Sequence, residues 1–226
     1  MSSRGHCNRS FNHTNLFFFP KDGSYKPDRT RPISVSNTDN RLVANVVRHV
    51  ITPFIQKIIN PAQKAFAKNS RIEEPIVFFN EKFYNALNNG EQYYIFYHDF
   101  GKAYDSVSRH FLLNLLRKIG IPPEIITMIE VLFHKIRACP ILNGQHKVHI
   151  EMINGLKQGC PLSPILFNLA IDPLLTSLNN LDPDLRAYCD DVAAGFSDPA
   201  QITPALCLFD KFNQATGMSS SVDKTR

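Results

Sequence analysis

Three aspartates in two short segments are the residues of this chain whose types and spacing could do chemistry. Asp190 and Asp191 are adjacent in Tyr188-Cys189-Asp190-Asp191, and Asp99 lies 91 positions before Asp190. Hard cations prefer oxygen ligands, and grouped carboxylates can hold two such ions about 3.5–4 Å apart, one activating the attacking oxygen and one stabilising the leaving oxygen. The pattern predicts a nucleotidyl transferase. Taken alone, an Asp-Asp pair is also typical of a turn or a helix cap.

The elements that carry these aspartates must bring them together. Residues 93–100 are rich in aromatic side chains and predict a buried strand, and residues 185–196 predict an apolar hairpin with Asp190-Asp191 at its turn. Because successive strand residues point to opposite faces, only a turn lets both members of the pair approach the same ions. We therefore expect an α+β fold in which an antiparallel sheet, with helices on one face, places the three carboxylates together.

The remaining elements follow from periodicity and from turn signals. Asp39 and Ser108 are expected helix N-caps, and Pro53 is expected to kink the first helix or to start a new one. Asn143-Gly144 predicts a hairpin turn between two short strands, 138–142 and 147–153. Helices are expected over residues 39–59, 72–87, 108–119, 124–136, 164–178 and 199–215, and the turn signal Asn88-Asn89-Gly90 is expected to end the second of them.

Composition limits the classes of protein to consider. The chain has 226 residues, 43% of them hydrophobic, which is enough for a real core in one large or two small domains. Its five cysteines are an odd number without a Cys-x-x-Cys pair, which argues against a disulfide framework or a zinc ribbon and favours a reducing compartment. His6, Cys7 and His13 lack a fourth metal ligand, so we interpret the first residues as a polar extension.

The charge distribution and the lack of a signal sequence favour an intracellular protein that binds phosphate groups. Residues 1–75 contain 12 Lys or Arg against 5 Asp or Glu, whereas residues 76–226 contain 13 against 15. A basic first third suits phosphate binding, although a charge excess is more often only a solvated face. No signal sequence opens the chain, and Phe17-Phe18-Phe19 is far shorter than the ~20 apolar residues that cross a bilayer. We expect a protein that is neither secreted nor embedded in a membrane.

Several longer motifs resemble those of one family. Three runs are similar to successive active-site motifs of reverse transcriptases, and their residues resemble most those of non-LTR (LINE-type) retrotransposons. These runs are 99–107 (Asp-Phe-Gly-Lys-Ala-Tyr-Asp-Ser-Val), 157–164 (Lys-Gln-Gly-Cys-Pro-Leu-Ser-Pro) and 188–191. Upstream, residues 31–34 and 63–71 resemble that family's fingers motifs, and residues 217–225 resemble its fourth palm motif. The resemblance runs in the family's order from about residue 20 to the last residue.

This resemblance implies the fold of a right-hand polymerase, with fingers and palm. It divides the chain into an N-terminal extension (1–26), fingers (27–91), the first catalytic palm strand (92–107), fingers and palm helices with a hairpin (108–154), and the remaining palm (155–226). The sequence ends at Arg226, directly after the fourth motif. We therefore expect the thumb to be missing and the chain to be a partial or weakly active copy.

The family's metal chemistry transfers onto matching positions. The resemblance implies that Asp99 and Asp190 hold two Mg²⁺ ions, with Mn²⁺ as an alternative, that Asp191 is a weaker partner, and that the backbone carbonyl of Phe100 is a further ligand. Lys224 matches a lysine that could protonate the leaving pyrophosphate, although it could equally be a solvated lysine. No organic cofactor is expected.

Nucleotide contacts are implied in the same way. Tyr104 matches an aromatic ring beneath the incoming sugar that excludes a 2′-hydroxyl, although such a residue is more often simply packed. Gln158-Gly159 would approach a nucleotide or template base closely. Arg31 and Arg41 would contact the triphosphate, with surface charges as the alternative. Arg71 also matches, but the residues around it differ from the Gly-rich motif of the family. Cys189 and Ser221 differ from the residues that the family usually has at their positions.

The function implied is RNA-directed DNA polymerisation, in which dNTPs are added to the 3′-hydroxyl of a DNA primer on an RNA template. Two alternatives stay open: a catalytically inactive nucleic-acid-binding remnant of the same fold, and an RNA-templated RNA polymerase, which the bulky Tyr104 disfavours. The expected location is intracellular, and the nucleus is compatible with a retrotransposon protein.

His98, beside Asp99, should point to the opposite face of the strand and be packed.

Overall fold

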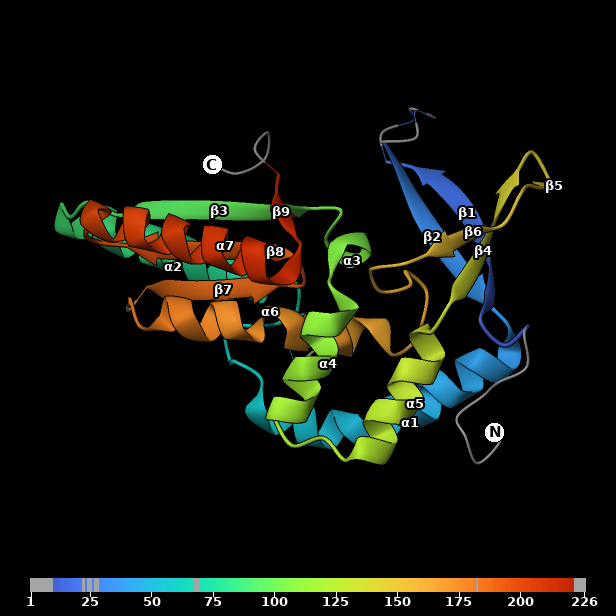
Figure 1. The fold of residues 1–226 in the computed structure, drawn as a ribbon. Coiled ribbons are helices and arrows are strands. Elements are labelled where there is room, and N and C mark those ends of the chain that lie inside the picture. Colours follow the sequence, from blue (N-terminus) through green and yellow to red (C-terminus); the bar gives the residue numbers. More distant parts are fainter. Residues whose placement is uncertain are drawn as a thin grey trace. The chain divides into compact units, whose positions relative to one another are not determined.

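The computed structural model describes residues 10–21, 23, 26, 29–66, 70–181 and 183–221. The chain forms two compact units (Figure 1). Unit 1 comprises residues 1–52 and 108–163, and unit 2 comprises residues 53–107 and 164–226. Each unit is therefore built from two separate stretches of the sequence. Within the described residues, no helix has the length and apolar character needed to cross a bilayer.

Unit 1 contains a mixed sheet and three helical segments. Its sheet has the order β2-β1-β4-β5, with β6 also paired to β4. Strands β1 and β4 run parallel, whereas the other pairs are antiparallel. Its elements are β1 (His13–Pro20), β2 (Thr30–Ser36), the part of α1 (Thr38–Ile58) up to Thr52, α4 (Arg109–Lys118), α5 (Pro123–Phe133), β4 (Ile136–Leu142), β5 (Gln145–His146) and β6 (Ile150–Met152).

Helix α1 differs from the sequence prediction at two points. It begins at Thr38, and the amide of Arg41 bonds the carbonyl of Asn37, so Asp39 lies in the first turn rather than at the N-cap. There its negative charge still interacts favourably with the positive end of the helix dipole. The helix also continues through Pro53 to Ile58, so the predicted restart is wrong. Only one i→i−4 hydrogen bond is lost at a proline, and buried side chains on both sides of it compensate.

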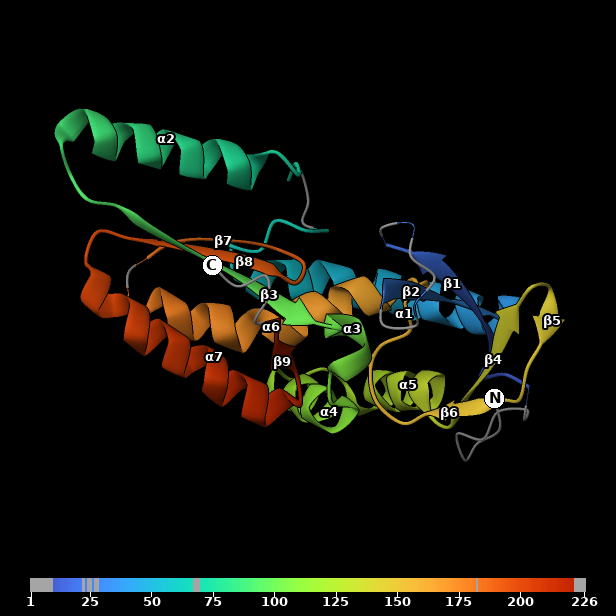
Figure 2. The same ribbon diagram turned by 90° about the horizontal axis from the view of Figure 1, so that it is seen from above.

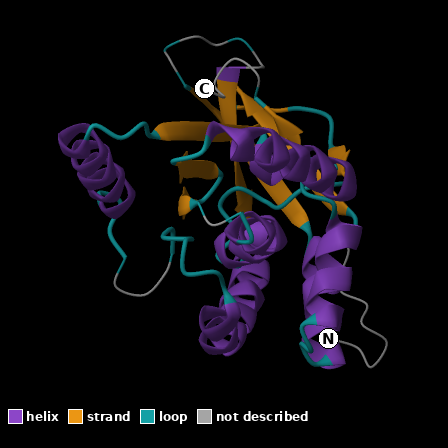
Figure 3. Cartoon of the chain, turned by 90° about the vertical axis from the view of Figure 1, so that its left-hand side faces the viewer, coloured by secondary structure: helices purple, strands orange, loops and turns teal. Residues whose placement is uncertain are grey.

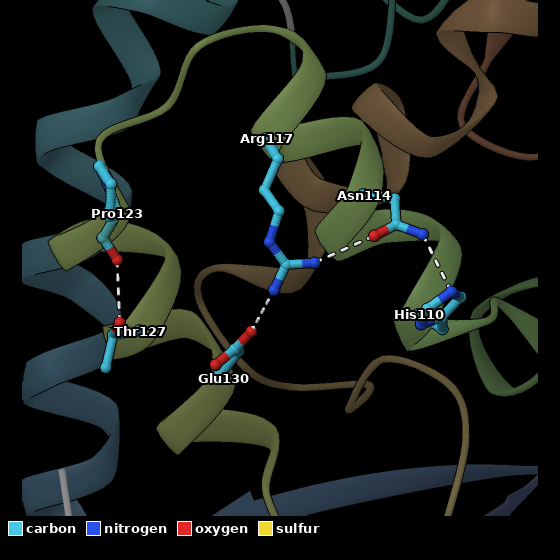
Figure 4. A network of polar contacts seen from close by, with 6 residues as sticks. All are labelled: His110, Asn114, Arg117, Pro123, Thr127 and Glu130. Atoms are coloured by element: carbon cyan, nitrogen blue, oxygen red, sulfur yellow. Dashed lines mark hydrogen bonds and ion pairs between the residues drawn. The ribbon is translucent and has the colours of Figure 1, made fainter. Parts of the chain in front are cut away.

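Local signals predicted α4 and α5 well. Ser108 is the N-cap of α4, because its hydroxyl accepts a hydrogen bond from the Phe111 amide at 3.2 Å. Figure 4 shows the polar contacts on these helices, where Arg117 donates to Asn114 at 3.0 Å and to Glu130 of α5 at 2.7 Å. Both charged side chains are about half exposed, so this ion pair contributes little to stability.

Unit 2 contains the predicted antiparallel sheet, in the order β7-β8-β3-β9. The hairpin of β7 and β8 and the strand β3 occupy the segments in which the sequence placed strands. The two-residue strand β9 and the single-turn helix α3 were not predicted. The elements are the end of α1, α2 (Glu74–Asn89), β3 (Tyr94–Gly101), α3 (Ala103–Ser106), α6 (Ser163–Asn179), β7 (Asp184–Tyr188), β8 (Asp191–Phe196), η2 (Pro199–Gln201), α7 (Ile202–Thr216) and β9 (Ser219–Ser220).

Helices cover both faces of this sheet, which corrects the expectation of helices on one face. The ring of Phe209 in α7 contacts Phe96 and His98, whereas Phe79 in α2 contacts Tyr97, the residue between them. Because alternate strand residues point to opposite faces, α7 and α2 lie on opposite sides. Figure 2 shows α2 on one side of β3, β7 and β8, with α6 and α7 on the other, and Figure 3 shows the helices and strands from another direction.

Helix α2 is attached to strand β7 by charged side chains. The guanidinium carbon of Arg186 lies 3.5 Å from the centroid of the Phe78 ring. The Lys82 ammonium nitrogen lies 2.8 Å from a carboxylate oxygen of Asp184. The helix ends at Gly90, which has a left-handed backbone with φ 69° and donates its amide to Ala86 and Leu87 carbonyls. The predicted Asn-Asn-Gly stop is confirmed.

Candidate active site

Strand pairing brings two of the three aspartates side by side. In the register of β3 and β8, Asp99 lies directly opposite Asp191. Directly opposed residues of antiparallel strands have Cα atoms about 4.5–5.5 Å apart and side chains on the same face. Both residues line a cavity of about 460 Å³ beside α2, together with Tyr97 and Arg186. Asp99 therefore meets Asp191 of the predicted pair within unit 2.

Asp190 lies in the two-residue turn between β7 and β8. Tyr188 pairs with Asp191, which leaves Cys189 and Asp190 as the loop of the hairpin. Cys189 has a positive φ of 60° and Asp190 does not, the pattern of a type II′ turn, whose first loop position favours glycine. Asp190 is half-buried and Asp191 exposed. The predicted turn is present, and a side chain other than glycine occupies its strained position.

Three side-chain contacts fix this turn. The side-chain oxygen of Gln63 accepts the Cys189 amide at 3.0 Å, and its nitrogen donates to the Cys189 carbonyl at 3.2 Å. The third contact joins the Tyr104 hydroxyl to the Cys189 sulfur at 3.1 Å. Burial is the main cause that raises the pKa of the Cys189 thiol to about 11, so the thiol is neutral near pH 7. Gln63 is the first residue of the motif at 63–71, but its contact with the turn was not predicted.

Tyr104 is held in place by an aromatic stack as well as by Cys189. Its ring lies parallel to that of Phe167 in α6, with centroids 4.6 Å apart and planes 11° apart. Lys102, with φ 50°, turns the chain after β3 so that Tyr104 returns toward the hairpin. Burial, followed by the Cys189 contact, raises the pKa of this phenol above its ordinary value. These contacts hold the Tyr104 ring close to the turn.

The residues fit divalent metal ions in chemistry, and in part in geometry. Asp99 and Asp191 are paired across strands, and Asp190 is their neighbour in the turn. Within the described ranges, however, no three His, Cys, Asp or Glu side chains converge closely enough to hold a metal ion. The fourth candidate ligand, the carbonyl of Phe100, belongs to a buried residue that pairs with Ser220 of β9. The set offers hard oxygen donors, which are the ligands that Mg²⁺ and Mn²⁺ accept.

Gln158-Gly159 meets a different motif within unit 1. The Gln158 carbonyl accepts the amide of Ser34 in β2 at 2.6 Å. Gly159 has φ 109°, and a Cβ atom there would lie 2.6 Å from the Ser34 carbonyl oxygen. The glycine is therefore required by a close approach of two backbone segments, which brings together the motifs at 31–34 and 157–164.

One buried and one half-buried cation hold the segment before Gln158, and sequence reasoning assigned a role to neither. Lys157 is fully buried, donates to the Asn40 side chain at 2.8 Å, and lies 5.5 Å from the Phe133 ring centroid. Arg109 donates to the carbonyls of Phe133, Met152, Asn154 and Gly155 at 2.8–3.0 Å. Burial is the main cause that lowers the pKa of Lys157 to about 8 and that of Arg109 to about 10.

The other candidates are placed as follows. Arg31 lies in β2 and Arg41 in the first turn of α1, and both are exposed; Arg71 is exposed before α2. Lys224 lies outside the described residues, as do His6 and Cys7. His98 is buried against Phe209 with ring centroids 4.0 Å apart, and burial lowers its pKa to about 4. It is packed, as predicted, and its lowered pKa keeps it neutral near pH 7.

Comparison with known proteins connects this geometry to a family. The family model described as reverse transcriptase (RNA-dependent DNA polymerase) matches residues 19–226. The chain is 26% identical over 189 residues to an uncharacterized 149 kDa protein of transposon TX1 from Xenopus laevis, covering 78% of this chain and 14% of that protein. It is 28% identical to the Pol polyprotein of the retrotransposable element R2DM from Drosophila melanogaster, covering 83% and 18% respectively.

A further relative and one solved structure extend the comparison. The Pol polyprotein of a type-1 R2 element from Popillia japonica is 24% identical over 234 residues, covering 98% of this chain and 33% of that protein. The chain thus spans a third or less of these relatives. A structure of telomerase from Candida tropicalis, in complex with a fragment of telomeric RNA, aligns over 96% of this chain and 41% of its own, with a TM-score of 0.72 at 13% identity.

The solved structure confirms the expected fingers and palm polymerase fold, and the TX1 and R2 proteins confirm the resemblance to non-LTR retrotransposons. Because the family model covers nearly the whole sequence, including all three aspartates, the chain belongs to the reverse transcriptase (RNA-dependent DNA polymerase) family.

Proposed function

We propose that this chain is the catalytic part of an RNA-directed DNA polymerase from a non-LTR retrotransposon, and that Asp99, Asp190 and Asp191 form its metal-dependent site. The observation that carries the proposal is the direct pairing of Asp99 with Asp191 next to a turn that holds Asp190. A family match over residues 19–226 supports the same assignment.

Asp99 and Asp190 would bind two Mg²⁺ ions, or Mn²⁺ in their place, with Asp191 and the Phe100 carbonyl as additional ligands. When bound, such ions activate the primer hydroxyl and stabilise the charge on the leaving pyrophosphate. The protein contributes the positions of the carboxylates, which strand pairing and the hairpin turn limit to a small region. Lys224 is proposed as the proton donor to pyrophosphate.

Tyr104 would select deoxynucleotides. A ring stacked on Phe167 and bonded to Cys189 cannot easily move aside for a 2′-hydroxyl, because both contacts would be lost. Arg31, Arg41, Gln158 and Gly159 remain predicted contacts of the incoming nucleotide. We propose unit 1 as the fingers and unit 2 as the palm, a division that differs from the sequence prediction by assigning residues 53–91 to the palm and residues 155–163 to the fingers.

The proposed partners are an RNA template, a DNA primer and dNTPs. Two features support nucleic acid: the excess of 12 basic over 5 acidic residues in the first 75, and the solved telomerase structure, which is a complex with RNA. Phosphate contacts supply much of the affinity in such complexes and make it fall with added salt.

Primer extension tests the proposal. The chain is incubated with a DNA primer on an RNA template, Mg²⁺ and either dNTPs or rNTPs, with a chelator as the metal control. Extension with dNTPs that stops on chelation supports the proposal. Salt-dependent RNA binding without extension at any protein concentration would favour a binding remnant, and preferential use of rNTPs would favour an RNA polymerase.

A further inference from the structure

We propose that Gln63 is a positioning residue for the catalytic hairpin: its side-chain amide holds the backbone of Cys189 in the conformation that presents Asp190. This inference rests on the proposed function, because it assigns Gln63 to the same metal-dependent site. Gln63 itself touches neither substrate nor metal in this account, and acts only through the turn.

The amide of Gln63 meets both polar backbone groups of one residue. Its oxygen accepts the Cys189 amide at 3.0 Å, and its nitrogen donates to the Cys189 carbonyl at 3.2 Å. The same oxygen also accepts the Ala65 amide at 2.9 Å. Gln63 is only 1% exposed, so water cannot replace these hydrogen bonds without opening the structure.

The backbone around Gln63 is itself fixed. Gln63 pairs with Ala187 of β7 in a parallel bridge, and the flanking residues Ala62 and Lys64 exchange backbone hydrogen bonds with Ala187 at 2.8 Å. The segment after α1 is thus tied to the edge of β7 by an isolated bridge and two backbone hydrogen bonds. An amide side chain on this edge reaches the turn two residues beyond Ala187.

Helix α6 anchors both ends of that segment. The Asp172 carboxylate accepts the Asn60 amide at 2.6 Å, and the Asn168 side chain donates to the Ala65 carbonyl at 2.6 Å. Asn60, Gln63 and Asn168 are all buried. A continuous set of hydrogen bonds therefore leads from α6 through Gln63 to the residue before Asp190.

The turn needs such support because Cys189 adopts φ 60°, a backbone conformation that is unfavourable for residues other than glycine. Without the two hydrogen bonds from Gln63, the Cys189 peptide is free to move to a more common conformation. Asp190 is joined to that peptide, so its carboxylate would move as well. The amide thus compensates for the absence of glycine at the first position of the turn.

Hydrogen exchange measures the contact without any need for activity. The chain contains five cysteines, so labelling with ¹⁵N-cysteine gives five amide signals, and Cys189→Ser identifies the one from the turn. In Gln63→Met, which keeps the length of the side chain but loses both hydrogen bonds, we expect the Cys189 amide to exchange about tenfold faster, the effect of one lost hydrogen bond. The signals of Cys139 and Cys160 should stay unchanged.

Gln56→Met is the matched control, because Gln56 is exposed on α1. It should leave all five exchange rates unchanged. If Gln63→Met fails to fold, Gln63→Asn replaces it, since an amide one methylene shorter cannot reach both Cys189 groups. An exchange rate at Cys189 within twofold of the unaltered chain, in whichever variant folds, overturns the proposal.

Steady-state kinetics then separates positioning from general stability. Gln63→Met should lower kcat for nucleotide addition about tenfold or more while KM for the dNTP stays within twofold, because only the placement of Asp190 changes. Faster exchange with an unchanged kcat would overturn the positioning role. If the unaltered chain adds no nucleotide, the proposed function fails, whereas the exchange experiment still decides whether Gln63 holds the turn.

Discussion

At the scale of single residues, the account depends on side chains whose surroundings restrict them to one role. Tyr104 is fixed by Phe167 and Cys189, Lys157 is buried against the Asn40 side chain, and Asp190 is held in a strained turn. Each of these environments has an experimental consequence. The motif sequences alone did not reveal them.

Replacing Tyr104 tests the proposed sugar gate. Tyr104→Ala removes the ring, so we expect the preference for dNTP over rNTP, measured as the ratio of kcat/KM values, to fall by about 10², the range available to an apolar wall that rejects one hydroxyl. Tyr104→Phe keeps the stack on Phe167 and loses only the contact with the Cys189 sulfur. It should retain the preference; equal ratios in Tyr104→Ala and the unaltered chain would refute the gate.

Lys157 should make the stability of the chain depend on pH in a characteristic direction. Burial lowers its pKa to about 8, whereas a lysine in the unfolded chain titrates near 10.4. Between about pH 8 and 10 the unfolded state therefore binds more protons, so this residue makes stability rise with pH.

Urea unfolding from pH 7 to 10 measures this dependence. The difference in unfolding free energy between the unaltered chain and Lys157→Met should grow in favour of the unaltered chain by on the order of 2 kcal/mol across this range. Lys147→Met, at an exposed position, is the control for the substitution itself. A difference that is flat with pH would mean that Lys157 is not buried in this way.

At the scale of elements, long-range backbone contacts hold the loops that carry motifs. The loop at 155–163 is fixed by Arg109, Lys157 and the approach of Gly159 to β2, and the β7–β8 turn is fixed by Gln63. In both cases a polar side chain from a distant part of the sequence satisfies backbone groups. Such contacts contribute to stability because a buried backbone group without a partner is costly.

Gly159→Ala should destabilise the chain strongly. A Cβ atom would lie 2.6 Å from the Ser34 oxygen at a φ of 109°, so we expect a loss of about 2–5 kcal/mol from overpacking and backbone strain together. Gly144→Ala is the control, because its φ is 74° but nothing lies within 4 Å of the added atom. It should cost only about 1–2 kcal/mol, and equal costs in urea unfolding would contradict the close approach.

Two arginines of α4 provide a second comparison. Arg109→Ala leaves three partly buried carbonyls and one exposed carbonyl without their donor, for which we expect a loss of about 2–4 kcal/mol. Arg117→Ala removes an exposed pair with Glu130 and should cost less than about 1 kcal/mol. Thermal or urea unfolding of both variants measures the difference. A larger loss at Arg117 would contradict the contacts described for Arg109.

At the scale of the whole molecule, the sequence predicted what local signals determine. Helical periodicity, the Ser108 cap, the Gly90 stop and the Asn143-Gly144 turn all depend on residues a few positions apart, and each is confirmed. The strand that carries Asp99 and the hairpin that carries Asp190-Asp191 were also predicted, because apolar segments ending in aspartates are short and distinct.

Features that depend on distant partners were not predictable from one sequence. The parallel pairing of β1 with β4 joins residues more than 120 positions apart, and the contact of Gln63 with Cys189 spans 126. Helix α2 packs on the sheet face opposite α7 through Arg186 and Phe78, a pair that no periodicity indicates. The division into fingers and palm, and the roles of Arg31, Arg41 and Lys224, remain predictions.

The most direct test of the central claim is the rate of single-nucleotide addition to a primer on an RNA template in Mg²⁺. Asp99→Asn and Asp190→Asn should each lower that rate by at least about 10³, because each removes a charged ligand of the proposed metal site, and Asp191→Asn should lower it by about 10–10². Asp210→Asn, on the exposed face of α7, should leave it within twofold. Addition by Asp99→Asn and Asp190→Asn at the rate of the unaltered chain would contradict the assignment of these carboxylates.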